Sequence, residues 1–472
     1  MVANRPMMFF VRISVQLLII GLVLGISWGS AFTYTSAAAD NNVQANMQAS
    51  KLQRMIDEAE PGSSIVLSEG SYSGSILIDK KLTIRAADKT VLSSKTADSA
   101  VVIKADGVVL QGLAIKQEHA DEETAAVLVQ ADNVVLMDLN IKTQGFGIML
   151  RQANEATILN NEIAWKNTRN TNGSVFGQKG NGIDLYNSYR NQIEQNRIYN
   201  MKDGIYLEKG SQLGIKENRI YSSRYGIHCM YIDDSQIVGN IGEYNFTGAM
   251  IMGVKDTRIS NNSFLKQSWN VYSQGILLYD VQTSTIDRNQ VDGNRVGIYM
   301  ERSSNNELKE NSVYRNFIGI QMLNTENNKL HHNDFVANVI EAEAVKSKDN
   351  EIYHNYWDSA QGLDLNDDGI SEVSYSINPF YQQLISDKPA FQLFFQSPGM
   401  TFLSSMYEGN RDQWTTDSSP FMHLNVAGDH ISTLSDTGGE HVLSEKTFML
   451  IIACMLLATA SLIIIYTGGS KS

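Results

Sequence analysis

The stretch DGIYLEKGSQLGIKENRIYSSRYGIHCMYIDDSQIVGN, residues 203–240, contains one pattern twice. A Gly-Ile pair stands at Gly204 and again at Gly226, and an Asn stands at Asn218 and again at Asn240. Both intervals are 22 residues long, and short alternations of apolar and polar residues lie between them. A fixed period of this length without a helical pattern indicates a stack of β-strand coils.

The two columns of residues continue on both sides of this stretch. The Gly that precedes an aliphatic residue recurs at Gly147, Gly182, Gly204, Gly226, Gly248, Gly275, Gly297 and Gly319. The Asn recurs at Asn161, Asn196, Asn218, Asn240, Asn262, Asn289, Asn311, Asn333 and Asn355. Because both columns lengthen in the same two intervals, we predict an all-β, right-handed parallel β-helix at 45–355, with roughly a dozen coils.

Each column has a physical reason in such a fold. Asn tolerates the left-handed conformation of a coil corner, and stacked Asn amides can hydrogen-bond from coil to coil. The Gly column predicts a second corner with an unusual backbone angle. Before the coils, Leu52, Met55, Ile56 and Ala59 share one face of a predicted short helix. We expect this helix to cap the open end of the first coil.

Both ends of the chain carry apolar segments. Residues 13–27 are apolar and follow Arg5 and Arg12, so 1–39 is predicted to be a signal peptide or an N-terminal anchor. Residues 447–466 carry no charge and have the length of a transmembrane helix. The basic residue beyond them, Lys471, predicts that the β-helix lies on the extracytoplasmic side of a cell membrane.

Between the coils and this helix we expect a C-terminal region at 356–425 and a linker at 426–446. Formal net charge is −13, which argues against nucleic-acid binding. The two cysteines, Cys229 and Cys454, are not expected to pair, because Cys229 falls in an inward apolar column and Cys454 in the predicted membrane helix.

Residues on the outer face of the predicted coils carry the candidate chemistry. Counted with each Gly as the first residue, the third and fifth residues point outward. This places His228 and Met230 on one coil and Met250 and Met252 beside them on the next, exposed to solvent. Thioether and imidazole groups together favour Cu(I). The alternative is that the methionines form an adhesive patch for another protein.

The run quoted above resembles the NosD family, as do GILLYD, HNYWDSAQGLDLNDDGISEVSY and FQLFFQSPGM. The resemblance covers about residues 45–425. It implies an exported, non-enzymatic β-helix protein that serves maturation of nitrous-oxide reductase by handling copper. The implied partners are an ABC transporter permease and ATPase, a copper-donating lipoprotein and the reductase. The C-terminal span departs from the soluble form of the family, and the stretch after Met406 follows the family pattern poorly.

Parallel β-helices also form carbohydrate-active enzymes, so a uronan lyase or epimerase is the main alternative, and a scaffold without a ligand is a third. Such enzymes need converging carboxylates or a basic residue beside an acid. We expect no Lys or Arg in the two outward columns and no defensible acid–base pair among Asp184, Glu208, Asp233 and Asp234.

Two further motifs permit metal binding. The sequence DLNDDG places Asp364, Asn366 and Asp368 at the first positions of a calcium loop, but Tyr375 replaces the Glu of its last position. A structural turn is the preferred interpretation, and a weak calcium site is the alternative. The histidines His331, His332 and His354 are interpreted as a solvated corner rather than a metal site.

Overall fold

The computed structural model describes residues 50–118, 124–166, 179–267, 273–377, 397–407 and 415–425, with isolated residues between 380 and 391. The predicted signal or anchor, the linker, the membrane helix and Cys454 lie outside the described residues. Within the described ranges, no helix is long and apolar enough to cross a membrane.

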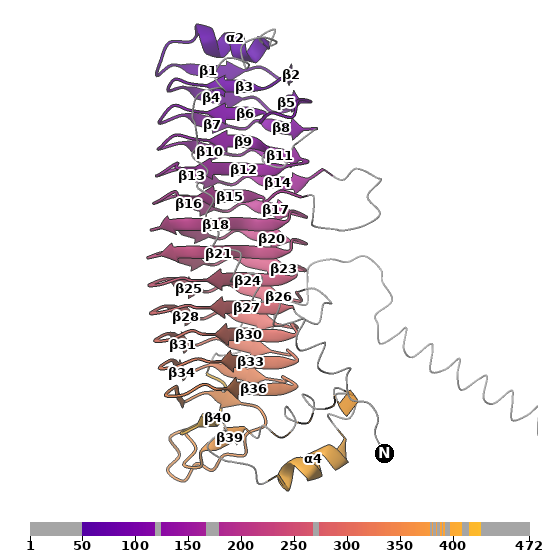
Figure 1. Ribbon diagram of the computed structural model, residues 1–472, viewed down its shortest axis with the longest axis vertical. Coiled ribbons are helices and arrows are strands. Elements are labelled where there is room, and N and C mark those ends of the chain that lie inside the picture. The colour runs from indigo at the N-terminus through magenta and orange to yellow at the C-terminus, as the bar shows by residue number, and fades with distance from the viewer. Residues whose placement is uncertain are drawn as a thin grey trace, which may run out of the picture. The chain divides into compact units, whose positions relative to one another are not determined.

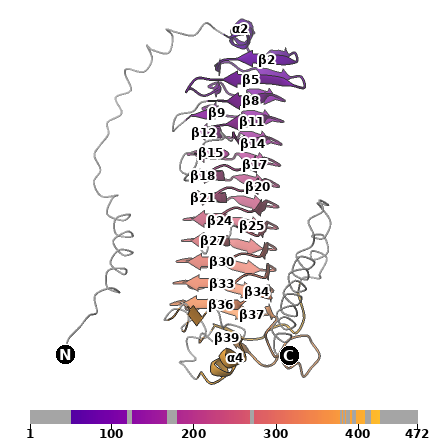
Figure 2. The ribbon, with the colours of Figure 1, turned by 90° about the vertical axis from the view of Figure 1, so that its right-hand side faces the viewer.

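The described residues between 64 and 357 form a parallel β-helix, in which each coil except the last contributes one strand to each of three sheets. Figures 1 and 2 show these strands stacked coil upon coil. The first sheet has 13 strands, in the order β1 (Ser64–Leu67), β4 (Thr83–Ala86), β7 (Val109–Gln111), β10 (Val135–Met137), β13 (Thr157–Leu159), β16 (Gln192–Glu194), β19 (Gly214–Lys216), β22 (Gln236–Val238), β25 (Arg258–Ser260), β28 (Thr285–Asp287), β31 (Glu307–Lys309), β34 (Lys329–His331) and β37 (Glu351–Tyr353).

The second sheet also has 13 strands, which follow those of the first sheet along each coil. Its order is β2 (Gly70–Ser73), β5 (Thr90–Ser94), β8 (Ala114–Gln117), β11 (Asn140–Thr143), β14 (Glu162–Trp165), β17 (Arg197–Tyr199), β20 (Arg219–Tyr221), β23 (Ile241–Glu243), β26 (Ser263–Leu265), β29 (Gln290–Asp292), β32 (Ser312–Tyr314), β35 (Asp334–Val336) and β38 (Tyr356–Trp357).

The third sheet has 12 strands and carries the candidate site. Its order is β3 (Ile76–Ile78), β6 (Val101–Ile103), β9 (Ala125–Val129), β12 (Phe146–Arg151), β15 (Ile183–Tyr186), β18 (Asp203–Ser211), β21 (Tyr225–Asp233), β24 (Thr247–Met252), β27 (Gln274–Tyr279), β30 (Val296–Glu301), β33 (Ile318–Leu323) and β36 (Ile340–Val345).

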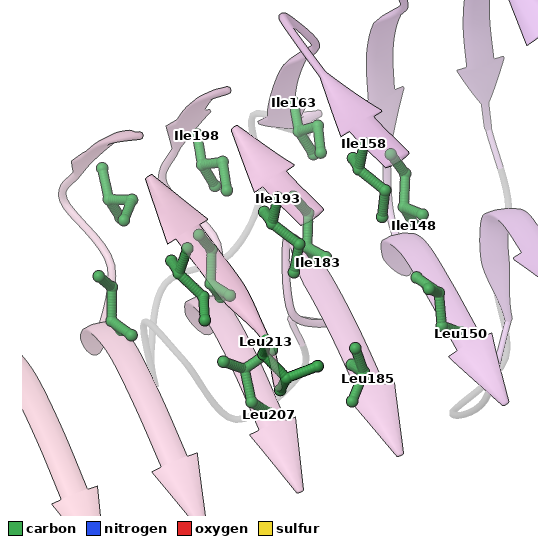
Figure 3. Close-up of a cluster of buried hydrophobic side chains, with 14 of the residues drawn as sticks. Ile148, Leu150, Ile158, Ile163, Ile183, Leu185, Ile193, Ile198, Leu207 and Leu213 are labelled. Atoms are coloured by element: carbon green, nitrogen blue, oxygen red, sulfur yellow. The ribbon is translucent and has the colours of Figure 1, made fainter. Parts of the chain in front are cut away.

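Aliphatic side chains from all three sheets fill the interior. Figure 3 shows this core where Ile158 and Ile193 of the first sheet meet Ile163 and Ile198 of the second, with Leu185 of the third close by. Each of these side chains is fully buried. The same apolar positions repeat in coil after coil, so the core is continuous along the stack.

The predicted Asn column forms a hydrogen-bonded ladder, as expected. Oδ1 of Asn240 accepts hydrogen bonds from the backbone N–H of Asn218 at 3.0 Å and from its Nδ2 at 3.0 Å. The expected left-handed conformation of these Asn residues is wrong, because the residue directly before each Asn adopts it. Glu217 (φ 54°) and Gly239 (φ 69°) are examples. The Asn is therefore retained for its buried amide rather than for its backbone angle.

The interpretation of the Gly column as a conformational requirement is also wrong. None of these eight glycines has a positive φ angle. A Cβ atom on Gly204 would instead lie 2.6 Å from the carbonyl oxygen of Gly226 on the next coil. Glycine is required because the backbones of successive coils approach too closely for a side chain.

Different elements lie beyond the first and last coils (Figure 1). The helix α2 (Lys51–Glu58) buries Leu52 and Ile56 completely, and Oε1 of Gln53 accepts a hydrogen bond from the backbone N–H of Leu77 in β3 at 2.7 Å. Beyond the last coil, β39 (Tyr375–Ile377) pairs with β40 (Thr415–Asp417), and α4 (Pro398–Ser405) is a separate helix.

Candidate metal-binding face

The predicted register of the candidate residues is confirmed. In the third sheet, His228 of β21 pairs with Met250 of β24, and Met230 pairs with Met252. Equal coil lengths keep both columns aligned, and all four side chains lie on the outer face of the sheet because Ile227, Cys229 and Ile251 occupy the core.

The expected solvent exposure of His228 is wrong, since only 7% of the residue is accessible. Two tyrosine rings pack against its imidazole. Tyr206, one coil earlier, lies 5.0 Å away between ring centroids, and Tyr225 on the same strand lies 4.9 Å away. The interplanar angles of 75° and 79° are those of edge-on packing. His228 thus points outward from the β-helix but lies beneath a layer of aromatic side chains.

A buried carboxylate orients this histidine. Oδ2 of Asp203 lies 3.0 Å from Nδ1 of His228, and Asp203 also accepts two hydrogen bonds from Arg224, at 2.8 and 2.7 Å. Burial alone would raise the pKa of Asp203, but the hydrogen bonds from His228 and Arg224 outweigh it and hold the pKa below its ordinary value. Because this carboxylate is an acceptor only, it stabilises the tautomer that carries the proton on Nδ1.

The other imidazole nitrogen has no partner. Within the part of the chain that the structure describes, Nε2 of His228 is the one buried side-chain nitrogen or oxygen without a hydrogen bond. With the proton on Nδ1, Nε2 presents a lone pair. A carboxylate behind one ring nitrogen and a free lone pair on the other is the usual arrangement of a metal-ligating histidine. The residues therefore fit a soft metal ion.

The three methionines, Met230, Met250 and Met252, are half-buried beside this histidine. The phenol oxygen of Tyr206 lies 3.4 Å from Sδ of Met230 and 2.7 Å from Oε2 of Glu208. On the far side, Met250 and Met252 begin a groove of about 400 Å³ that extends over β27, β30 and β33, with a lining of Gln274, Leu277, Tyr279, Arg295, Val296, Tyr299, Glu301, Ile318 and Gln321. The thioethers of Met250 and Met252 are consequently accessible from the outer face.

The expectation that the outward columns contain no basic residue is wrong. Arg151 pairs with Tyr186 in the fifth-residue column, and its guanidinium lies 2.7 Å from a carboxylate oxygen of Asp184. Burial raises the pKa of Asp184, and the charge of Arg151 opposes that effect. Asp184 also accepts a hydrogen bond from Asn181 at 2.6 Å. Two buried carboxylates, Asp184 and Asp203, each with its own arginine, therefore precede the methionines.

Cys229 is buried in the core, as predicted, and burial raises the pKa of its thiol. It is therefore not a thiolate ligand for the outer face.

The DLNDDG sequence forms a turn in which side-chain oxygens accept hydrogen bonds from nearby backbone N–H groups. Asp364 accepts hydrogen bonds from the N–H groups of Asp367 at 2.7 Å and Gly369 at 2.8 Å. The side-chain oxygen of Asn366 accepts a hydrogen bond from the backbone N–H of Asp368, and a carboxylate oxygen of Asp368 accepts one from the backbone N–H of Ile370. These backbone hydrogen bonds lower the pKa of Asp364. These contacts support the structural turn, and the weak calcium site at Asp364, Asn366 and Asp368 stays a prediction.

The histidines of the last coils are not a solvated corner. Nδ1 of His331 lies 2.8 Å from Nδ1 of His332, and Nε2 of His331 lies 3.1 Å from Glu307. His354 stacks on Phe421, with ring centroids 5.3 Å apart. These rings instead help to seat the segment 415–425. Among the described residues, no three His, Cys, Asp or Glu side chains are grouped to hold a metal ion, so any metal on the outer face needs the methionines.

Asp203 and Arg224 are not among the residues predicted from the sequence. The signal lies in the position directly before each Gly of the column, which is a third outward column. It carries Asn181, Asp203, Tyr225, Thr247 and Gln274 on successive coils, whereas Phe146, Val296 and Ile318 occupy it on the coils before and after them. Arg224 directly precedes Tyr225 and reaches back one coil to Asp203.

A family model described as "Periplasmic copper-binding protein (NosD)" matches residues 165–375, and a model of a right-handed β-helix region matches residues 82–241. A search of curated proteins finds no match.

Three solved structures have a similar fold. The Family 28 exopolygalacturonase of Yersinia enterocolitica is 11% identical over 64% of this chain and 74% of its own, with a TM-score of 0.42. The periplasmic alginate epimerase AlgG is 14% identical over 64% and 82%, with a TM-score of 0.45. The A-module of the Azotobacter vinelandii mannuronan C-5 epimerase AlgE6 is 12% identical over 64% and 93%, with a TM-score of 0.42.

Similarity this distant says nothing about activity. The family match, by contrast, covers the coils that carry His228 and the three methionines. With its three stacked parallel sheets, the chain is a NosD-type parallel β-helix protein.

Proposed function

We propose that this protein is an accessory factor that binds Cu(I) on the outer face of its third sheet and hands it on. The buried, unpartnered Nε2 of His228 carries the proposal, because the strand register places Met250 beside this residue and Met230 and Met252 on the same outer face. Copper is here a substrate that the protein passes on. The description of the matching family as periplasmic and copper-binding supports the same role.

The charge balance of the site favours a monovalent ion. The negative charge of Asp203 is matched by Arg224, and a thioether adds no charge to the site. Cu(I) accepts imidazole and thioether ligands without a strong demand for geometry, whereas Ca²⁺ and Mg²⁺ need oxygen ligands. Met side chains are flexible enough to complete a coordination sphere around one fixed imidazole.

The proposed setting is the extracytoplasmic side of a membrane, during maturation of nitrous-oxide reductase. The proposed partners are the permease and ATPase of an ABC transporter, a copper-donating lipoprotein and the reductase. The groove that begins at Met250 and Met252 supports a handover, because a partner can approach these two sulfur atoms there. Membrane attachment through 447–466 belongs to the same proposal.

Titration of the purified full-length chain with Cu(I), in competition with a chromophoric Cu(I) chelator, tests the proposal. We expect one Cu(I) per chain. The triple substitution Met230/Met250/Met252→Leu should abolish binding with little change in stability, since Leu and Met have similar volumes. Substitution of His228 by Gln should weaken binding strongly.

The chain offers a matched control for the methionines. Met300 and Met322 lie on β30 and β33 of the same sheet but are buried in the core. The double variant Met300/Met322→Leu should bind Cu(I) as the unmodified chain does. Equal loss of binding in the control, or no binding by the unmodified chain, would contradict the proposal.

A carbohydrate-active enzyme remains the alternative, and Asp184 and Asp203 would be its acidic residues. Each of these carboxylates is almost fully buried, and each is bound to an arginine. The groove at Met250 and Met252 includes neither of them. Turnover of a uronic-acid polymer by a chain that fails to bind Cu(I) would favour the enzyme.

A further inference from the structure

Two Tyr-x-Glu pairs lie on the outer face of the third sheet, on either side of the methionines. The phenol of Tyr206 donates to Glu208, and the phenol of Tyr299 donates to Glu301, each at 2.7 Å. Both tyrosines are half-buried and occupy the third-residue column. The two pairs are thus chemically equivalent, but their neighbours differ.

Tyr206 contacts two of the proposed copper ligands. Its ring packs edge-on against the imidazole of His228, and its oxygen lies 3.4 Å from Sδ of Met230. The register places Tyr206 directly beside His228 and Glu208 directly beside Met230. Tyr299, by contrast, is beside Leu277 and Gln321.

A metal ion cannot reach Nε2 of His228 until a neighbouring side chain moves, because this atom is buried. Of the two rings against the imidazole, Tyr225 is the more firmly held. The guanidinium of Arg224 lies 4.4 Å from the centroid of that ring, and Asp203 fixes Arg224 through two hydrogen bonds. Tyr206 is held outside the sheet by its hydrogen bond to Glu208.

The phenol has one proton and two acceptors within reach. A carboxylate is a much stronger acceptor than a thioether, so the proton goes to Glu208 and the oxygen remains beside the sulfur of Met230. In this position the ring of Tyr206 covers the imidazole of His228, and its phenol oxygen occupies the space beside Sδ of Met230.

We propose that Tyr206, latched by Glu208, is the gate of the copper site, and that Cu(I) enters only when this phenol swings out. This inference rests on the function proposed above. It makes Tyr206 a positioning residue that stabilises the closed, metal-free form. Only the open form binds Cu(I). The apparent association constant is therefore that of the open form multiplied by the fraction of molecules that are open, and the latch lowers this fraction.

Stopped-flow uptake of Cu(I) from a chromophoric chelator by the full-length chain tests the gate. Substitution of Tyr206 by Phe keeps the ring and removes the latch, which we expect to increase the association rate about tenfold. The dissociation rate should not change, so the dissociation constant should fall by the same factor. Glu208→Gln should give a smaller change in the same direction, and it also tests the latch if Tyr206→Phe fails to fold.

Tyr221→Phe in β20 of the second sheet supplies the control, because this half-buried tyrosine stacks on Tyr199 and lies outside the groove, and it should leave both rate constants unchanged. Equal rates in Tyr206→Phe and Tyr221→Phe would overturn the gate, as would slower uptake by Tyr206→Phe. Failure of the unmodified chain to take up Cu(I) would instead overturn the proposed function, so the two failures are distinguishable.

Discussion

The side-chain amide of Asn355 donates a hydrogen bond to Oδ2 of Asp417, 62 residues further along the chain, at 2.9 Å. The backbone N–H of Asn355 donates to the same oxygen at 3.0 Å, as does Nε1 of Trp357 at 3.0 Å. In every other Asn of the ladder, the side-chain amide and the backbone N–H both donate to the side-chain oxygen of the Asn on the next coil. Asp417 therefore takes the place of the next Asn and ends the ladder with a group that needs only to accept.

Removal of this acceptor should release the C-terminal segment from the last coil. In Asp417→Ala, the backbone N–H of Asn355 and Nε1 of Trp357 lose their acceptor, and Nδ2 of Asn355 loses one of its acceptors. We expect a loss of at least about 2 kcal/mol in the free energy of local opening. Hydrogen exchange at the amides of residues 355 and 415–421 measures this change. In Glu351→Ala, which removes an exposed carboxylate that pairs with Lys329, exchange at these amides should change by less than about 1 kcal/mol.

The ladder also shows how far the sequence alone predicts this molecule. A constant interval of 22 residues determines which side chains share a face, so the register of His228 with Met250 follows from counting. Hydrogen bonding between stacked Asn residues follows from the chemistry of the amide. These predictions succeed because neighbouring coils repeat the same local structure.

The remaining features depend on contacts that break the repeat. Asp417 lies beyond the last regular interval, and nothing in the spacing of residues indicates that it continues the Asn column. The burial of His228 depends on Tyr206, Tyr225 and Asp203, whose side chains reach across coils. A periodic pattern predicts where a side chain begins but not what covers it.

The close approach of backbones at the Gly column predicts a severe effect of a small substitution. In Gly226→Ala, the new methyl group would meet the carbonyl oxygen of Gly248, and neither backbone can move without breaking the sheet. We expect destabilisation by about 3 kcal/mol or more, measured by urea denaturation. Gly399→Ala in α4 has no atom within 4 Å of the new Cβ and should not be destabilised. Equal stability of the two variants would contradict this account.

Acidification should loosen the attachment of the C-terminal segment to the last coils. Burial, followed by the charges of His331 and His354, lowers the pKa of His332 below its ordinary value of 6.5, while Glu310 opposes and Lys309 adds to the shift. His332 then binds more protons when the segment has detached than when it is attached, so this stability is present above pH 6.5 and is lost as the pH falls below it. Hydrogen exchange of residues 415–425 at pH 7.5 and pH 5.5 measures the effect.

The variant His332→Asn should flatten this dependence, since Asn does not titrate and tolerates the positive φ angle of 57° at this position. His423→Asn removes an exposed histidine of the same segment and should retain the full dependence on pH. If His332→Asn responds to pH as the unmodified chain does, the histidine cluster is not the cause.

Asp203 should determine the affinity of the site for Cu(I) without touching the ion. In Asp203→Asn the charge that stabilises the Nδ1–H tautomer of His228 is lost, and Arg224 is left without its carboxylate. Loss of such an orienting group typically weakens metal binding about 10- to 100-fold. Because the pKa of Asp203 lies below its ordinary value, the difference from the unmodified chain should persist from pH 8 down to pH 5.

The matched control is Asp287→Asn in β28, which removes an equally buried carboxylate bound by Arg258 but has no histidine beside it. A similar loss of Cu(I) affinity in both variants would mean that Asp203 acts through stability alone.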